Sequence, residues 1–582
     1  MNLSIMKKWN TFKQSIYFNT FCYFWSGIFA TLSFAPYSLA FFSLLAPMGL
    51  FWIEDKYRGK YKILLKKGLL FSIVMCTLSY YWINHMLTVF GGFPLFLSIP
   101  LFLLYCIIVN WKFGVFMVIF SYLKTKLGRR NFILAGFCIL VAEFGTWQIF
   151  PWYYGNLLAS NIILAQTVEY FGVYGLSVLT FIVSYAIYKF PFMAFAKRNS
   201  KKKILFAYSF PLYILISFFA LGTFLFLKWE SQVPTKIKQV LMIQPDAPLE
   251  FRDGRFKETM DLLMEKIEKL VLEGSKEIRP DIIVLPESGV PFFSANNTAA
   301  TTTYETAYWY RYEALIYQLT NRYKANFYFN EIDASFENDI VSKENLRFHN
   351  NSVVYDPNGD RKDFYRKSYL LAFGEYIPLG ETFPFLYELI PQVGRFLPGT
   401  EQNLLTYYKP NSIPKFQKSF LKWEESSYIN MQNHKEYFKE NRSELTVEGK
   451  FLPLICYEVI LPEFVRKFYK KEMPDFIINI TNDKWYGDTV ESYEHLDLAR
   501  LRSIEFRRWM VRSTNSGTSA FVDHLGRIVG NQTTKLLSAA QFSKSVPVFN
   551  SEPTFYLKYG NLLAWIFLFL FSAYGILKVK FF

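Results

Sequence analysis

Three residues of the sequence stand where a side chain could take part in covalent catalysis. Cys456 ends the apolar run 451–455, and a strand that ends in a nucleophile and a sharp turn presents that side chain at the top of a sheet. Glu287 follows the apolar run 281–285, and α/β proteins gather active groups at such sheet edges. Lys367 lies among glycine, proline and aromatic residues that indicate a fixed loop. A thiol, a carboxylate and an ammonium are therefore candidates for one site.

These three residue types together suit nucleophilic attack on a carbonyl group. Taken singly, each has a simpler interpretation, as a small buried hydrophobe, a capping residue or a solvated surface charge. A thiol with an ordinary pKa near 8.5 needs a base or a cation to become a thiolate at neutral pH. A glutamate can accept that proton, and a lysine can stabilise both the thiolate and the oxyanion of a tetrahedral intermediate.

No other set of residues competes with these three. The sequence has no Gly-rich phosphate loop, no CxxC pair and no Cys/His cluster, so it predicts neither a metal nor a cofactor. None of the five histidines sits in a recognisable nucleophile motif; they are His85, His349, His434, His495 and His524.

Glu287, Lys367 and Cys456, in that order, resemble the catalytic residues of the nitrilase (carbon–nitrogen hydrolase) superfamily. Within it, the sequence is more similar to the apolipoprotein N-acyltransferases, and this resemblance extends over nearly the whole chain. The segments that carry it are Phe373-Gly374-Glu375, Cys456-Tyr457-Glu458, 482–488, 512–517, 33–36 and 150–152. Ordinary nitrilases are soluble, so apolar segments before and after the polar region make the resemblance to this subfamily specific.

The resemblance implies a reaction and its two lipid partners. The Cys456 thiolate would attack an acyl ester of a membrane phospholipid, leaving a thioester and releasing lysophospholipid. The amine of an apolipoprotein's N-terminal diacylglyceryl-cysteine would then take the acyl chain. Glu287 would be the general base, and Lys367 would stabilise the oxyanion and the thiolate.

The resemblance also implies supporting residues around this triad. Glu375 and Glu458 match further functional glutamates of the family, Tyr457 and Trp485 match positions that line the site, and Asn482 opens the segment 482–488. The sequence departs from the family at Tyr486, where phenylalanine is frequent, and at the polar segment 406–449. That segment is interpreted as an insertion or a mobile loop, which leaves the shape of the acceptor entrance open.

The segments that must position these residues have the pattern of an α/β domain. Apolar runs that end in turn residues predict strands, and one stretch has helical spacing at 256–273; the strands are expected at 240–243, 281–285, 351–355, 451–456 and 476–480. Strands separated by helices predict helices packed on sheets, and the resemblance implies a nitrilase-like αββα sandwich. The catalytic domain is expected at 236–545.

The rest of the chain is apolar enough to lie in a membrane. Hydrophobic residues make up 52% of the sequence and charged residues only 19%, below the roughly 25% usual for soluble proteins. About eight stretches approach the ~20 residues of a spanning helix; they lie near 16–34, 37–53, 64–85, 95–123, 132–149, 171–189, 204–228 and 558–577. The sequence therefore predicts a membrane domain at 1–230 and a C-terminal membrane helix with a short tail at 555–582.

The positive charges indicate how this membrane domain is oriented. Residues 1–230 carry 21 Lys and Arg against 5 Asp and Glu, which accounts for the whole net charge of +16. The charged loops alternate with loops that have no Lys or Arg, at about 35–37, 86–94 and 150–170. The positive-inside rule then places both termini in the cytoplasm and the catalytic domain outside. The family resemblance implies that this outside is the periplasmic side of an inner membrane. A basic excess confined to apolar segments also argues against a nucleic-acid partner.

Two other functions stay open at this point. A membrane-tethered amidase would use water in place of the lipoprotein amine, although a small soluble substrate would not require membrane helices. A transporter or assembly protein with a large outside domain would have paired intramembrane charges, for which only Lys112 and Glu143 are available. We expect Lys112 to face other helices or a water-filled crevice, because a lipid-facing charge is costly.

Overall fold

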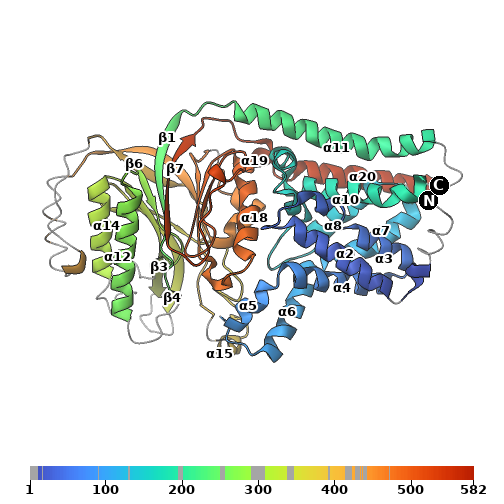
Figure 1. Ribbon diagram of the computed structural model, residues 1–582, viewed down its shortest axis with the longest axis horizontal. Coiled ribbons are helices and arrows are strands. Elements are labelled where there is room, and N and C mark those ends of the chain that lie inside the picture. Colours follow the sequence, from blue (N-terminus) through green and yellow to red (C-terminus); the bar gives the residue numbers. More distant parts are fainter. Residues whose placement is uncertain are drawn as a thin grey trace. The chain divides into compact units, whose positions relative to one another are not determined.

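The fold is that of a computed structural model of the 582-residue chain (Figure 1). It describes residues 11–15, 17–89, 91–128, 131–194, 201–248, 256–289, 309–336, 346–390, 393–412, 423–425, 433, 436, 442–470 and 472–581. The chain forms two compact units. The helical unit comprises residues 1–231, 489–506 and 553–582, and the sheet unit comprises residues 232–488 and 507–552.

The helical unit is built from long apolar helices with short helices between them. Its longer helices are α2 (Tyr17–Ser33), α3 (Met48–Tyr57), α4 (Tyr61–Ser79), α5 (Trp82–Val89), α6 (Leu95–Asn110), α7 (Lys112–Leu127), α8 (Ile133–Gly145), α10 (Val168–Ala194), α11 (Lys201–Glu230), α18 (Glu491–Phe506) and α20 (Leu562–Phe581). The short helices are η1 (Ala40–Leu44), η2 (Tyr154–Leu158), α9 (Ile162–Ala165) and α19 (Phe555–Tyr559). A continuous core of buried aromatic and aliphatic side chains runs from α2 to α20.

The described helices support fewer membrane spans than the sequence predicts. Two, Val168–Pro191 and Tyr208–Glu230, are long and apolar enough to cross a membrane. The number rises to four if α4 with α5, bent by 72°, and α6 with α7, bent by 43°, each form one span. The stretch predicted at 37–53 is divided into η1 and α3, because Pro47 directly precedes α3 and a helix cannot run through it undisturbed. The figure of about eight spans stays a prediction.

Lys112, the charge predicted to face other helices, is fully buried within the helical unit. Its Nζ donates a hydrogen bond to the carbonyl oxygen of Trp152 at 2.5 Å and lies 4.0 Å from the centre of the Trp152 ring. The ammonium is therefore held by a carbonyl and an aromatic face rather than by lipid, as expected from its cost in hydrocarbon.

The sheet unit contains two β-sheets with helices outside them. The first sheet has the order β11-β1-β2-β3-β4-β5 and consists of β1 (Lys236–Gln244), β2 (Ile282–Val284), β3 (Asn326–Phe336), β4 (Leu346–Tyr355), β5 (Arg361–Arg366) and β11 (Ala540–Val548). The second has the order β10-β9-β8-β7-β6 and consists of β6 (Leu405–Pro410), β7 (Leu445–Ile455), β8 (Ile477–Thr481), β9 (Met510–Thr514) and β10 (Ala520–Val522). Strands β1 to β3 are parallel to one another, and so are β7 to β9.

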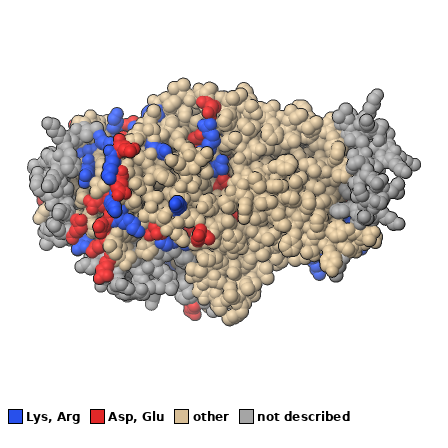
Figure 2. Space-filling view, viewed as in Figure 1, with Lys and Arg blue, Asp and Glu red and all other residues tan. Residues whose placement is uncertain are grey.

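Helices α12 (Phe256–Gly274) and α14 (Trp309–Tyr323) run side by side along the first sheet (Figure 1). Their apolar faces and the facing strands share one core of buried side chains, among them Ile267, Leu315 and Phe327. Shorter helices complete the unit: α15 (Phe385–Leu389), α17 (Pro462–Arg466), η5 (Trp423–Glu425), η6 (Cys456–Ile460), η7 (Asp483–Tyr486) and η8 (Val529–Asn531). Figure 2 shows charged side chains gathered over the sheet unit, whereas the visible face of the helical unit is almost uncharged.

Two segments differ from the sequence prediction. The segment 406–449 is not loop throughout: its ends form β6 and β7, which pair antiparallel, because residues such as Tyr407 alternate between buried and exposed positions. Within it, the Trp423 indole donates to Glu268 on α12 at 2.9 Å; residues 413–422, 426–432, 434–435 and 437–441 lie outside the described residues. Residues 489–506, expected inside the catalytic domain, group with the helical unit. There, Leu501 and Ile504 of α18 enter a core shared with helix α10 residues.

Candidate active site

Cys456 directly follows strand β7, which pairs parallel with β8 in the second sheet, and it is the first residue of η6. Its φ is +55°, in the left-handed region that a side chain with a Cβ seldom adopts. Such a conformation costs on the order of 1–3 kcal/mol and is characteristic of functional turns. The side chain is only 6% exposed. The sequence therefore forms a strained turn that fixes one thiol at the edge of the second sheet.

Glu287 lies just past β2, at the carboxyl end of parallel strands in the first sheet. Its Oε1 accepts a hydrogen bond from Asn350 Nδ2 at 2.8 Å, and its Oε2 accepts one from the backbone N–H of Asn482 at 3.1 Å. Because Asn482 follows β8, the carboxylate is held by groups from both sheets. Its position is therefore set by the packing of the sheets against each other.

Lys367 follows β5 and is buried, with 2% of its surface exposed. Its Nζ lies 3.3 Å from Oε1 of Glu287 and 2.9 Å from Oε2 of Glu375. Burial alone lowers the pKa of this ammonium, but the two carboxylates outweigh burial and hold the pKa well above its usual value. Lys367 is therefore protonated at neutral pH and is paired with two carboxylates, one more than its single charge can neutralise.

The Cys456 thiol experiences opposing influences from this charged group. Burial raises its pKa well above the ordinary value, the negative charge of Glu287 raises it further, and Lys367 and a hydrogen bond with Thr481 lower it. The net result is a neutral thiol in the resting site. For such a thiol to attack a carbonyl group, a base must remove its proton. Glu287 is the carboxylate whose charge raises the pKa of the thiol most.

Glu458 and Tyr457 connect the nucleophile's turn to the Lys367 segment. Oε1 of Glu458 accepts hydrogen bonds from the Tyr365 hydroxyl at 2.8 Å and from the backbone N–H groups of Ser368 and Tyr369 at 2.9 and 3.0 Å. Its Oε2 accepts from the N–H of Ile455 at 2.9 Å. The Tyr457 hydroxyl donates to the carbonyl of Leu370 at 3.1 Å. These contacts fix the position of the Lys367 segment relative to the turn at Cys456. Burial raises the pKa of Glu458 to about 7.

Comparisons with known proteins agree with this geometry. A family model described as the apolipoprotein N-acyltransferase N-terminal domain matches residues 26–186, and one described as carbon-nitrogen hydrolase matches residues 252–545. Apolipoprotein N-acyltransferase 2 of Leptospira interrogans is 50% identical over 581 residues, which cover 97% of each chain. The chain belongs to the apolipoprotein N-acyltransferase family.

More distant members of the family also match along their whole length. Apolipoprotein N-acyltransferase 1 of Leptospira interrogans is 30% identical and covers 95% of this chain and 96% of its own. The apolipoprotein N-acyltransferase of Haemophilus ducreyi is 23% identical and covers 95% of both chains. Membership in the family therefore includes the helical and the sheet regions alike, as the sequence motifs predict.

The family's predicted supporting residues occupy different kinds of position. Glu375, Tyr457 and Glu458 join the network around Lys367 and Cys456, as the preceding contacts show. Asn482 contributes its backbone N–H to Glu287, and its buried Nδ2 has no hydrogen-bond partner among the described residues. Trp485 lies on η7 and is 40% exposed, so it stands at the surface of the sheet unit.

Two asparagines at this apolipoprotein N-acyltransferase site were not predicted from the sequence. Asn350 on β4 donates both to Glu287 and to Oε1 of Glu375, at 2.8 and 2.7 Å. Asn330 on β3 donates to Oδ1 of Asn350 at 2.6 Å and so fixes the orientation of its amide. The available signal was the polar run 349–352 inside a strand whose side chains are buried, since buried amides require partners.

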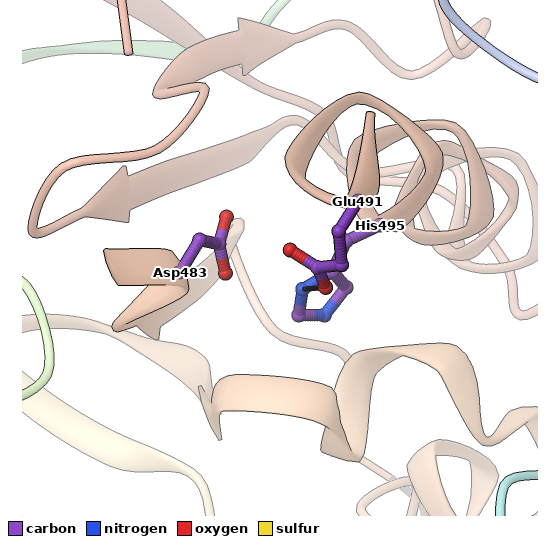
Figure 3. A group of neighbouring side chains, drawn as sticks. All are labelled: Asp483, Glu491 and His495. Carbon is purple, nitrogen blue, oxygen red and sulfur yellow. Dashed lines mark ion pairs between the residues drawn. The ribbon is translucent and has the colours of Figure 1, made fainter. Parts of the chain in front are cut away.

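Figure 3 draws three further titratable side chains, Asp483, Glu491 and His495. In the sheet unit, Asp483 is paired with the buried Arg512 at 3.0 Å and accepts a hydrogen bond from Thr481 at 3.0 Å. In the helical unit, Nδ1 of His495 lies 3.5 Å from Oε1 of Glu491, one turn away on α18. We assign these side chains to the support of their own units, and no metal is assigned to them.

Proposed function

We propose that the protein transfers an acyl chain from a membrane phospholipid to the N-terminal amine of a diacylated apolipoprotein, through a thioester on Cys456. The observation that carries this proposal is the buried Lys367 ammonium, which lies between Glu287 and Glu375 beside a strained cysteine turn. The names of relatives that match nearly the whole chain support an apolipoprotein as the acceptor of the acyl chain.

In the first half-reaction the sulfur of Cys456 attacks the ester carbonyl of the phospholipid while its proton passes to Glu287. The C–S bond forms, and the carbonyl oxygen becomes an oxyanion that Lys367 stabilises. When the C–O bond of the ester breaks, Glu287 returns the proton to the leaving alkoxide. The products are a Cys456 thioester and lysophospholipid, with Glu287 again a carboxylate.

In the second half-reaction the amine of the apolipoprotein attacks the thioester carbonyl. Glu287 accepts a proton from the nitrogen, the C–S bond breaks, and the thiolate leaves and recovers its proton from Glu287. The acyl chain is now an amide, which is more stable than either ester, so the overall transfer is effectively one-way. The kinetics are ping-pong, because lysophospholipid leaves before the acceptor reacts.

Exposed apolar side chains near Lys367 support a lipid donor. Phe373, Leu379, Phe383 and Phe385 follow Lys367 in the sheet unit, and between 47% and 69% of each side chain is exposed. The rings of Phe383 and Phe385 lie 6.2 Å apart, and exposed apolar patches mark places where lipid or protein is bound. A small soluble amide, the substrate of the alternative amidase, gives no reason for such a surface.

The proposal includes a location in the membrane. The alternation of charged and uncharged loops supports both termini in the cytoplasm, about eight spans and the catalytic domain on the periplasmic side of the inner membrane. On that side the acyl donor is the outer leaflet's phospholipid, and the acceptor is an exported lipoprotein.

Labelling of Cys456 tests the proposal. The purified protein is incubated with a phospholipid that carries a radiolabelled acyl chain, denatured, and treated with hydroxylamine, which cleaves thioesters. Wild-type protein should retain a hydroxylamine-labile label and release lysophospholipid without acceptor. Cys456→Ala should retain none, and Cys456→Ser should be nearly as inactive, because a hydroxyl is a much weaker acid than a thiol. Cys138→Ala, a change in the helical unit, is the matched control.

Two outcomes would contradict the mechanism. An equally labelled Cys456→Ala protein would mean that another nucleophile holds the acyl chain. Lysophospholipid that appears only when a diacylated lipopeptide is added would indicate direct transfer.

A separate measurement distinguishes the amidase alternative. If mass spectrometry of the complete reaction finds free fatty acid and no acylated lipopeptide, the protein is a hydrolase, as the amidase alternative predicts.

A further inference from the structure

Helix α20 presents a stripe of side chains that ends in a cation. Phe567, the adjacent pair Leu570 and Phe571, Tyr574 and Lys578 recur every three or four residues, so they lie on one face of the helix. At 1.5 Å per residue the stripe is about 16 Å long, roughly half of the ~30 Å hydrocarbon thickness of a bilayer. Its length therefore matches one leaflet, with the polar residues at one end.

An open cavity of about 920 Å³ lies between this stripe and the facing ends of α7 and α8. Leu127 of α7 and Ile133 of α8 line it on one side, and the five stripe residues of α20 line it on the other. The Phe571 ring packs against Phe137 of α8, with ring centres 4.5 Å apart, and this contact supports one wall. Pockets of 300–1,000 Å³ are of the size that binds small molecules.

The charge of Lys578 has no counter-ion within the described part of the chain. Its Nζ donates to the carbonyl of Leu127 at 2.8 Å and to the hydroxyl of Tyr574 at 3.2 Å, and both partners are neutral. None of the ion pairs among the described residues includes it. An ammonium beside a tyrosine at the end of an apolar stripe is typical of a side chain at the membrane interface.

We propose that this cavity binds one anionic phospholipid. The phosphate of the headgroup pairs with Lys578, and an acyl chain lies along Tyr574, Leu570 and Phe567 toward the middle of the bilayer. The charge favours an anionic over a zwitterionic lipid, because basic pockets between membrane helices bind anionic headgroups. None of these residues belongs to the catalytic constellation, so the site is separate from the acyl-transfer chemistry and does not depend on it.

Native mass spectrometry of the full-length protein tests the proposal. The protein is released from detergent after equilibration with equal amounts of phosphatidylglycerol and phosphatidylcholine, and the number of each lipid retained is counted. Wild-type protein should retain one phosphatidylglycerol in preference to phosphatidylcholine. Lys578→Gln should weaken that retention about fivefold, which corresponds to the ~1 kcal/mol that one lysine contributes at an anionic membrane surface.

Two further variants separate the cavity from general surface charge. Leu570→Trp fills part of the cavity without removing charge, at a residue that is 60% exposed and so tolerates the change; it should lower retention of phosphatidylglycerol as well. Lys126→Gln removes an exposed lysine from the last turn of α7 that does not line the cavity, and retention should be unchanged.

Three results would overturn the proposal. The first is equal retention of both lipids by the wild-type protein, which would indicate ordinary surrounding lipid. The second is an equal loss in Lys126→Gln and Lys578→Gln, which would indicate attraction by surface charge in general. The third is a dimer that retains no lipid, which would mean that a second copy of the chain covers the cavity.

Discussion

Replacement of Lys367 by methionine is the sharpest test of the proposed charge arrangement. Methionine keeps much of the bulk of lysine but removes the ammonium that faces Glu287 and Glu375 at 3.3 and 2.9 Å. Loss of one partner from a buried ion pair costs about 3–5 kcal/mol, because the remaining charge has no compensation. Because the folded-state pKa of Lys367 is raised, its stabilising contribution is complete at neutral pH and is lost only in strongly alkaline solution.

The same change should also abolish most of the catalysis. Loss of an oxyanion stabiliser costs on the order of 3 kcal/mol of transition-state stabilisation, which slows acylation of Cys456 by more than about a hundredfold. Stability and chemistry can be separated by a second substitution. In Lys367→Met/Glu375→Gln only one of the two carboxylates left without a cation remains, so the melting temperature should recover part of its loss, whereas acylation should not recover.

The assay combines thermal melting in detergent with the rate of lysophospholipid release. Lys367→Met alone should melt at a lower temperature than wild-type protein, because it leaves two buried carboxylates without their cation. Lys450→Met is the matched control, since Lys450 on β7 forms an exposed ion pair with Glu472 and such pairs contribute little. Near-normal acylation by a folded Lys367→Met protein would refute the reasoning and make Lys367 a structural residue.

Three further predictions concern Asn350, Glu458 and the topology of the chain in the membrane. Asn350→Leu removes hydrogen bonds to two carboxylates, so it should lower the free energy of unfolding by about 2–4 kcal/mol and slow acylation, measured by melting and by hydroxylamine-labile label. The pKa of Glu458 is raised to about 7, so the free energy of unfolding should fall by about 3 kcal/mol as the pH rises from the ordinary pKa of a glutamate through 7. The melting temperature of the wild-type protein should therefore fall over this pH range, and that of Glu458→Gln should not. A reporter fused near residue 410 should score as periplasmic and one near residue 200 as cytoplasmic, and cytoplasmic labelling at 410 would contradict the topology.

The strands and the position of Cys456 at a strand end could be predicted because their signals are local. An apolar run such as 451–455 that ends in a turn reports both a buried strand and the residue at its end, and β7 does end at Ile455 with Cys456 directly after it. The run 281–285 reports β2 in the same way, and Glu287 follows it. Strands β2 and β7 belong to different sheets, so each local pattern predicts where its own residue lies, and the packing of the two sheets brings the residues to one site.

The remaining features depend on contacts between distant parts of the chain. Nothing near Asn350 in the sequence shows that it will meet Glu375, because that contact requires β4 and the Lys367 segment to be neighbours. The polar composition of 406–449 concealed two strand ends, since β6 and β7 stabilise each other by pairing. Helix α18 carries charged residues as a soluble helix does, yet it groups with the helical unit. The composition of a helix indicates whether it is soluble, but not which part of the chain it packs against.

In the proposed mechanism, the charges at the site allow a buried cysteine with a raised pKa to act as a nucleophile. With Lys367 positive and Glu287 and Glu375 negative, the resting group has a net charge of about −1, and a thiolate beside it would add a second buried negative charge, which is costly. Transfer of the thiol proton to Glu287 avoids that cost, because one negative charge disappears as the other forms. The negative charge then moves from sulfur to the oxyanion beside Lys367 as the bond to the acyl carbon forms. The site thus keeps its net charge constant throughout the half-reaction, and the thiol remains protonated until a substrate carbonyl is there to receive the charge.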